Sequence, residues 1–205
     1  MQKEADHLII RDFHPTDLSR VSNIIAESFK EKFQKLSNFS VQQLPNVLQE
    51  TGLIYSTFFP GYLVAEQNNE ICGVMVLKWK NQNRPPNKYR FHVGKTYGYW
   101  KIIKLFLGLW LLTHKPNQGE CYIEHIAVKP AFRGQKIGSK LILFGKNFAK
   151  ENMFQHLSLF VSSKNNDAIR LYKKLGFNII KIEKSFLTKT LFGIKQWYHM
   201  KQSLK

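Results

Sequence analysis

The fold is decided by residues 120–177, which read ECYIEHIAVKPAFRGQKIGSKLILFGKNFAKENMFQHLSLFVSSKNNDAIRLYKKLGF. Two apolar runs in it, 121–128 and 156–162, have the length and composition of strands. A helix signal follows each run: apolar residues recur at helical spacing after the turn at 133–138, and Asn and Asp residues at 165–167 form a capping cluster. Alternating strands and helices predict an α/β arrangement. The apolar face of the first helix comprises Ile137, Leu141, Phe144 and Phe148.

The rest of the chain extends this pattern in both directions. We expect an α/β (α+β) fold in one domain over residues 1–205, with a mixed, mostly antiparallel sheet of six to seven strands flanked by helices. The further strands expected are 8–13, 61–66, 70–79, 177–183 and 196–200. Two further helices are expected to begin near Asp17 and Ser40. We expect an irregular segment at 80–95 and a lysine-rich connection at 184–195.

Composition excludes several classes of protein. With 205 residues, 43% of them hydrophobic, the chain is long enough for one packed domain and too apolar to be disordered. Cys72 and Cys121 are too few for a disulfide framework or a thiolate zinc site, so no metal is expected and a reducing compartment is favoured. The polar opening 1–7 gives no secretory signal, and we expect a cytoplasmic, bacterial protein.

The charge of the chain points to an anionic partner. Lys and Arg number 31 against 14 Asp and Glu, which gives a net charge of +17. Residues 101–205 hold most of the excess, with 19 basic and 5 acidic side chains. Nucleic acid, an anionic membrane and a phosphorylated cofactor all suit such a surface, as does a basic face that only meets solvent.

One segment, 100–112, is unusually apolar and reads WKIIKLFLGLWLL. Its uninterrupted apolar run, 105–112, is far shorter than the roughly 20 residues that span a bilayer. As a helix it would be apolar on nearly all sides. We expect a buried helix, with a lid over a substrate site and an interfacial membrane contact as less favoured alternatives.

The turn at 133–138, RGQKIG, is a candidate anion site. The first N–H groups of a helix have no acceptor within it and lie at the positive end of the helix dipole. Gly134 and Gly138 let a ligand approach the main chain, which suits a pyrophosphate. The flanking positive charges are Arg133, Lys136 and Lys140.

Two motifs in this order resemble those of the GCN5-related N-acetyltransferase superfamily. The family's turn, Arg/Gln-x-x-Gly-x-Gly/Ala, is matched by Arg133 and Gly138, whereas Lys136 stands at the usual central glycine. The family's second motif, Asn-x-x-Ala-x-x-Leu-Tyr-x-x-x-Gly-Phe, is matched throughout by residues 165–177. The lysine implies either that the backbone avoids positive φ at this position or that some strain is accepted. The motifs fall within 118–180, after a family-variable insertion at 80–118.

The resemblance implies a protein that binds acetyl-coenzyme A (acetyl-CoA) as co-substrate. Acetyl-CoA would lie in an opening between two splayed central strands, 124–128 and 157–161, with its pantetheine arm along the first strand and its pyrophosphate on the turn. The implied cofactor-binding residues are Ile126, Ala127, Val128, Arg133, Gly134, Gln135, Lys136, Ile137, Gly138, Ser139, Asn165 and Tyr172.

Direct attack of an amine on the thioester is the chemistry that the resemblance implies. Tyr172 matches the family's general acid. Glu124, with Tyr122 on the same strand face, is the candidate base, and a partly buried carboxylate there is expected to have a raised pKa. His125 is expected to point to the opposite face as a packed histidine. Phe160 stands where many peptide-terminus acetyltransferases have Glu or His, which makes a peptide terminus the less favoured acceptor.

The sequence therefore predicts an acetyl-CoA-dependent N-acetyltransferase that acts on a primary amine of a small molecule or peptide, as a monomer or homodimer. Two alternatives stay open. One is a basic nucleic-acid-binding module, which lacks a recognised motif. The other is a non-catalytic acyl-CoA sensor, which the substitution at Lys136 would permit.

Overall fold

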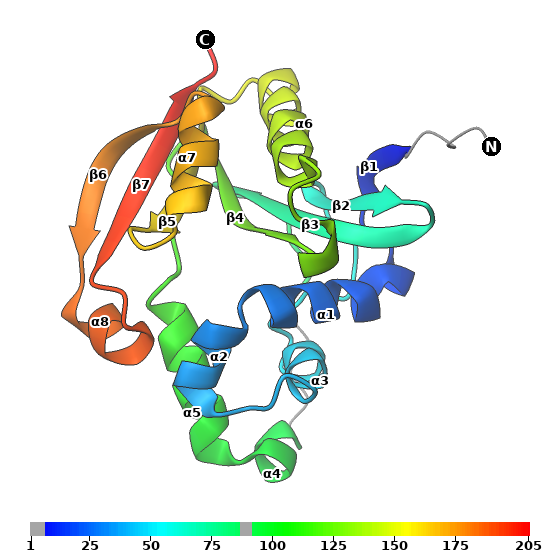
Figure 1. Ribbon diagram of the computed structural model, residues 1–205, viewed down its shortest axis with the longest axis vertical. Helices are drawn as coiled ribbons and strands as arrows, with labels where there is room; N and C mark the ends of the chain where they lie inside the picture. Colours follow the sequence, from blue (N-terminus) through cyan, green and yellow to red (C-terminus); the bar gives the residue numbers. More distant parts are fainter. Residues whose placement is uncertain (1–6, 87–91) are drawn as a thin grey trace.

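A seven-stranded sheet runs through the computed structural model, which describes residues 7–86 and 92–205 (Figure 1). The strand order is β1-β2-β3-β4-β5-β7-β6. Only β4 and β5 are parallel, and all other neighbours are antiparallel, which confirms the expected mixed sheet. The strands are β1 (Leu8–Asp12), β2 (Tyr62–Gln67), β3 (Glu70–Trp79), β4 (Glu120–Val128), β5 (His156–Ser162), β6 (Asn178–Lys184) and β7 (Gln196–Ser203).

Helices cover both faces of the sheet, as the alternation along β3 requires (Figure 1). Val74 and Val76 join the core shared with α1 and α3, whereas Met75 and Leu77 join the core under α6 and α7. The helices are α1 (Leu18–Ser28), α2 (Lys30–Ser37), α3 (Leu44–Glu50), α4 (Val93–Tyr97), α5 (Tyr99–Trp110), α6 (Ile137–Glu151), α7 (Asn166–Lys174) and α8 (Phe186–Phe192), with 3-10 turns at Pro15–Asp17 and Pro130–Phe132.

Three helices were not expected from the sequence: α2, α4 and α8. The polar α2 buries little more than Phe33 and Leu36. The lysine-rich connection after β6 contains α8, where the Ser185 hydroxyl accepts a hydrogen bond from the Thr188 N–H at 3.2 Å. The expected irregular segment 80–95 falls partly on 87–91, outside the described residues, and α4 begins within it.

Most of the apolar segment 100–112 lies in α5, which ends at Trp110, and the expectation of a buried helix is wrong. Leu105 and Gly108 are buried, but Trp100 and Trp110 are 77% and 71% exposed. The side of α5 that carries Gly108 packs on α2, and Leu36 is so close that a Cβ added at Gly108 would lie 2.3 Å from it. No helix in the described ranges is long and apolar enough to cross a membrane.

A β-bulge in β4 opens the sheet between β4 and β5. Val76 pairs with His125 and Leu77 pairs with Ile123, which leaves Glu124 without a partner on β3. A bulge bends its strand and increases the local twist. The pairing of β4 with β5 ends at the same place, with Ile123 opposite Leu159. The two central strands therefore splay apart, as expected.

Candidate functional site

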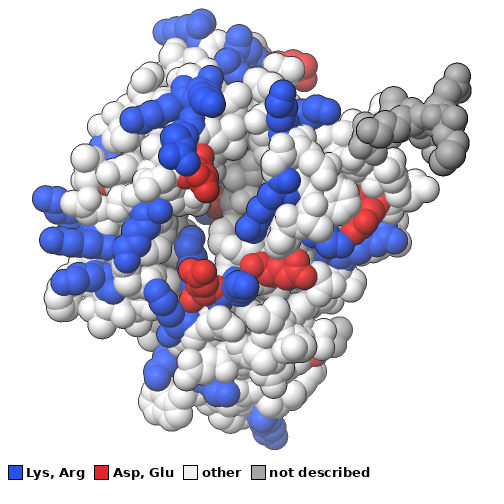
Figure 2. Space-filling model, viewed as in Figure 1, with Lys and Arg blue, Asp and Glu red and all other residues white. Residues whose placement is uncertain are grey.

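The diverging ends of β4 and β5 open into a cavity of about 620 Å³. Figure 2 shows a hollow near the middle of this face, surrounded by charged side chains of both signs. The strands β4 and β5 form one wall, and α7 contributes to a second. The far side comes from α2, from α8 and from the segment that follows α5. The predicted site residues on the cavity wall are Tyr122, Glu124, Ile126, Asn165 and Tyr172.

Beyond Ile123, the edge of β4 that faces β5 has no strand partner. Its free backbone groups can pair with an extended ligand, as an added strand would. Ile126 lines the cavity next to this edge. The Ala127 side chain is buried in the core, and the Val128 carbonyl accepts a hydrogen bond from Arg133 Nε at 3.4 Å. Only backbone contacts with a ligand are therefore open to Ala127.

The turn before α6 has two residues in the left-handed region. Gly134 has φ 83°, and Lys136 has φ 62° and ψ 11°. The backbone at Lys136 does not avoid positive φ, so the alternative of accepted strain holds: a residue with a side chain adopts a backbone conformation that favours glycine. No side chain caps the first turn of α6, so its N–H groups are open to a ligand. A Cβ added at Gly138 would touch Leu171 and Val128 at an ordinary 3.8 Å, so packing within the chain does not demand this glycine.

The turn lies outside the cavity wall, at the end of β4. Arg133, Gly134, Gln135 and Lys136 are exposed, Gly138 and Ser139 are half-buried, and Ile137 packs into the core. The predicted cofactor-binding residues thus form two groups: one in the splayed opening and one on the surface where α6 begins.

On the opposite wall, α7 presents Tyr172 to the cavity. Asn165 caps this helix, and its side-chain oxygen accepts a hydrogen bond from the Ala168 N–H at 3.2 Å. Tyr172 is buried, with its ring centroid 6.0 Å from that of Phe177. Burial raises the pKa of Tyr172 to about 12, so the phenol keeps its proton at neutral pH.

Glu124, the bulge residue, is held between two cations. Its Oε2 lies 2.7 Å from Arg84 Nη1, and its Oε1 lies 3.4 Å from Lys78 Nζ. Arg84 also donates to the Leu77 carbonyl at 2.7 Å and lies over the ring of Phe59 at 4.8 Å. Burial opposes the charge of Glu124, but Arg84 outweighs it and the pKa of the carboxyl is lowered. The expected rise of this pKa is wrong because its cationic partners were not foreseen.

His125 lines the same cavity as Glu124, which corrects the expectation that it faces the other way. The bulge explains the difference, because strict alternation of side chains fails where one strand has an extra residue. Burial lowers the pKa of His125, only partly offset by the neighbouring Glu124 charge. The imidazole is therefore neutral at pH 7 and can accept a proton.

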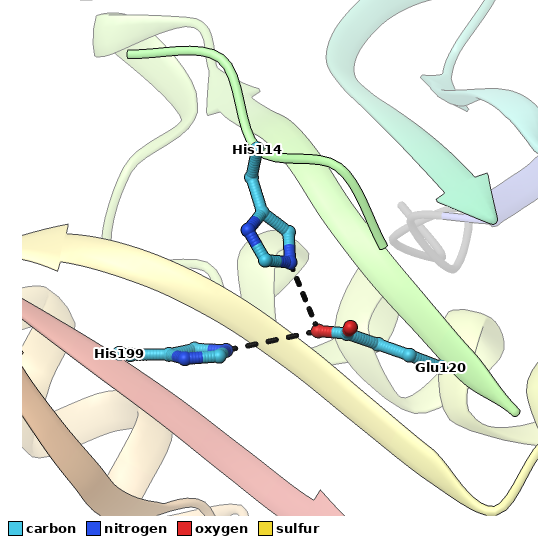
Figure 3. Close-up of side chains that lie close together, drawn as sticks. All are labelled: His114, Glu120 and His199. Carbon is cyan, nitrogen blue, oxygen red and sulfur yellow. Dashed lines mark hydrogen bonds and ion pairs between the residues drawn. The ribbon is translucent and has the colours of Figure 1, made fainter. Parts of the chain in front are cut away.

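A second polar cluster lies where β4 begins (Figure 3). Glu120 is 3% exposed; its Oε1 accepts hydrogen bonds from the Ser158 hydroxyl and from His114 Nε2 at 3.2 Å, and its Oε2 accepts one from the Asn117 N–H at 2.8 Å. His199 Nε2 lies 3.7 Å from Oε1. Burial opposes the charge of Glu120, but these hydrogen bonds lower its pKa below the usual range.

The sequence analysis missed this cluster because no spacing connects its members. Its histidines come from the segment before β4 and from the last strand. The available signal was Glu120 itself, an acidic residue at the start of a strand whose next three residues, 121–123, are buried and carry no charge.

The sequence profile of the Acetyltransferase (GNAT) family matches residues 19–177, and the chain belongs to this family. It is 34% identical over 83 residues to a candidate ribosomal protein bS18 alanine N-acetyltransferase of Bacillus subtilis, covering 40% of this chain and 52% of that protein. It is 26% identical over 174 residues to mycothiol acetyltransferase of Acidothermus cellulolyticus, covering 84% of this chain and 45% of that protein. The chain thus spans about half the length of these curated relatives.

Among solved structures, the PaiA N-acetyltransferase of Thermoplasma acidophilum, in complex with coenzyme A, shares the fold. The TM-score is 0.55 at 16% identity, and the match covers 96% of this chain and 99% of that one.

Proposed function

We propose that this chain is an acetyl-CoA-dependent N-acetyltransferase that transfers the acetyl group to a primary amine of a small molecule or peptide. The observation that carries the proposal is the opening between β4 and β5, which begins beyond Ile123 and leads into a cavity with a protonated Tyr172 on its wall. Family membership and the N-acetyltransferase names of the relatives support it.

The donor would bind along the free edge of β4 and on the turn before α6. Amide and carbonyl groups of residues 124–128 would hold the pantetheine arm, and the uncapped N–H groups of α6 would hold the pyrophosphate. Arg133, Lys136 and Lys140 are exposed beside this turn and add positive charge. Coenzyme A in a protein of the same fold supports this donor.

Tyr172 would act on the departing sulfur. A phenol with a pKa of about 12 stays protonated, and it would donate a hydrogen bond to the thiolate as the carbon–sulfur bond breaks. Because a thiol has a pKa of roughly 8.5, complete proton transfer from this phenol is uphill. The main contribution of Tyr172 is therefore stabilisation of the developing charge.

The proton released by the amine needs a separate acceptor. Glu124 is a poor base because Arg84 lowers its pKa, and we assign it to positioning the acceptor. We assign proton acceptance to His125, which is neutral, lines the same cavity and would receive the proton directly or through a water. Tyr122 lines the wall beside them, and burial raises the pKa of its phenol, so that it stays protonated at neutral pH and does not serve as the base.

The far end of the cavity favours an acceptor that carries an anionic group besides its amine. Lys32 Nζ lies 5.0 Å and 5.2 Å from the ring centroids of Phe29 and Trp197, all on the cavity wall. Lys35 lines the same end, with its Nζ 3.2 Å from the Phe192 carbonyl. Glu31 and Glu183 also line the cavity, so the environment carries both signs of charge. A carboxylate placed against Lys32 and Lys35 would meet two ammonium groups, and amino acids and short peptides are therefore the first acceptors to test.

The test is an acceptor screen with the full chain and acetyl-CoA. Release of free coenzyme A thiol would be measured with amino acids, short peptides and simple alkylamines, and products would be identified by mass spectrometry. We expect acceptor-dependent release and an N-acetylated product, both strongly reduced in Tyr172→Phe. Tight acetyl-CoA binding with no transfer to any amine would instead support the non-catalytic sensor.

A further inference from the structure

We propose that His114, Glu120 and His199 bind a zinc ion through His114 Nε2, Glu120 Oε1 and His199 Nε2. These three residues, called the His–Glu–His cluster below, lie together at the start of β4 (Figure 3). The proposal does not depend on acetyl transfer.

The spacing of the three atoms suits a tetrahedral ion. Glu120 Oε1 lies 3.2 Å from His114 Nε2 and 3.7 Å from His199 Nε2, and all three atoms lie within 4.8 Å of one another. With zinc–ligand bonds of about 2.0–2.1 Å, tetrahedral geometry places neighbouring ligand atoms roughly 3.3–3.4 Å apart. An ion between these atoms would need only small side-chain adjustments.

A hydrogen-bonded network alone leaves one nitrogen unexplained. His199 Nε2 is buried and has no hydrogen-bond partner, and its 3.7 Å distance to Glu120 is too long for a hydrogen bond. Its ring is fixed by stacking on Phe160, at 4.4 Å between centroids and 15° between planes. Buried polar atoms are seldom left unpaired. A metal ion would satisfy this nitrogen without moving the ring.

The charge of the cluster also calls for a cation. Glu120 is 3% exposed, and among the described residues no Lys or Arg forms an ion pair with it. The buried Asp17 and the partly buried Glu124 each have an arginine. Hydrogen bonds from Ser158, Asn117 and His114 stabilise this carboxylate, and a divalent ion would add the fixed positive charge that neither Lys nor Arg supplies.

The types of ligand, and the hydrogen bonds that orient the carboxylate, favour zinc. Two imidazole nitrogens argue against Mg²⁺ and Ca²⁺, which prefer oxygen ligands. The Asn117 N–H and the Ser158 hydroxyl both donate to the Glu120 carboxylate and fix its orientation. Three protein ligands leave the fourth zinc position to a water. Since His114 also lines the cavity, that position is placed to be reached from the substrate side.

Metal titration tests the proposal without an activity assay. The full chain would be stripped with a chelator and titrated with Co²⁺, whose tetrahedral complexes absorb visible light, and Zn²⁺ would then displace it. We expect one ion per chain and a rise in Tm of about 5–11 °C at 100 times the Kd of zinc. His199→Gln and His114→Gln should each weaken zinc binding by about 100-fold or more.

His156→Gln is the matched control. His156 lies on the neighbouring β5 and also has an unpartnered buried ring nitrogen, but it is not part of the cluster. Its replacement should leave the zinc affinity unchanged. The proposal is overturned if the folded chain binds no zinc at about 100 μM, or if His199→Gln binds it as tightly as the unaltered chain. Either result would mean that the cluster is held by hydrogen bonds alone.

Discussion

The donor end and the acceptor end of the proposed site are built in different ways. The donor end reaches from the splayed opening to the surface turn before α6, it comes from one stretch, 120–177, and most of its proposed contacts are backbone groups. The proposed acceptor end is assembled from α2, α8, β7 and the segment that follows α5, and its polar groups are side chains. Backbone recognition demands turns and caps that leave a sequence motif, whereas a side-chain pocket from scattered segments leaves none.

The largest effect is expected at the donor end, from Tyr172→Phe. The variant removes only the hydroxyl that we propose stabilises the departing sulfur, so kcat should fall by about 10³-fold with little change in the KM for acetyl-CoA. Steady-state kinetics and a thermal melt would measure both. An unchanged kcat would mean that the sulfur leaves without help from this wall.

His125→Asn is expected to have the next largest effect. Because burial lowers the pKa of His125 below 6.5, kcat should be constant around neutral pH and decline as the pH falls through that lowered value. The variant should have a kcat about 10²-fold lower, and its kcat should no longer show this decline at acid pH, the acid limb of the profile. Glu124→Gln is the comparison, and if it alone removed the acid limb, the proton acceptor would be Glu124.

Arg84→Met tests how much the ion pair between Arg84 and Glu124 contributes to stability. Removing the partner of the partly buried Glu124 should lower the free energy of unfolding by about 2 kcal/mol. The lowered pKa of Glu124 contributes stability above its ordinary value of 4.5 and loses it as the pH falls through the lower folded value. The difference between variant and unaltered chain, measured by urea unfolding, should therefore shrink at pH 4.

A matched double variant sharpens this test. Arg84→Met with Glu124→Gln removes both charges and should recover part of the lost stability. No recovery would indicate that Arg84 acts through its packing on Phe59 and not through Glu124.

The smallest effect is expected for Lys136→Gly. Lys136 has φ 62°, so glycine should relieve strain and stabilise the chain by about 1 kcal/mol, a rise in Tm of roughly 2–4 °C. The affinity for acetyl-CoA should fall only modestly, since the charge of Lys136 is lost while the N–H groups of the turn, Arg133 and Lys140 stay in place. A lower Tm would show that Lys136 makes a stabilising contact that offsets its backbone strain.

The sequence predicted what depends on local structure. The Asn165 cap, the helix that carries Tyr172 and the strand that carries Ile126 follow from neighbouring residues, and the structure places all three at the cavity. The direction of His125 was not predictable, because the bulge at Glu124 depends on pairing with β3.

Contacts between distant segments were missed for the same reason. Arg84 reaches Glu124 from 40 positions earlier in the chain, and this pairing reversed the predicted pKa shift. His114 and His199 meet at Glu120 only because β7 inserts between β5 and β6. The exposure of α5 likewise depends on how little of it α2 covers.

The most direct test of the central claim is acetyl-CoA binding to the unaltered chain and to Gly138→Val. A Cβ at Gly138 would lie at an ordinary 3.8 Å from Leu171 and Val128, and the valine methyl groups should fill the space where the pyrophosphate is proposed to approach. Isothermal titration should show one saturable site in the unaltered chain and about tenfold weaker binding in the variant, which corresponds to roughly 1.4 kcal/mol. No binding to the folded, unaltered chain, or equal affinity in the variant, would contradict the proposed donor site.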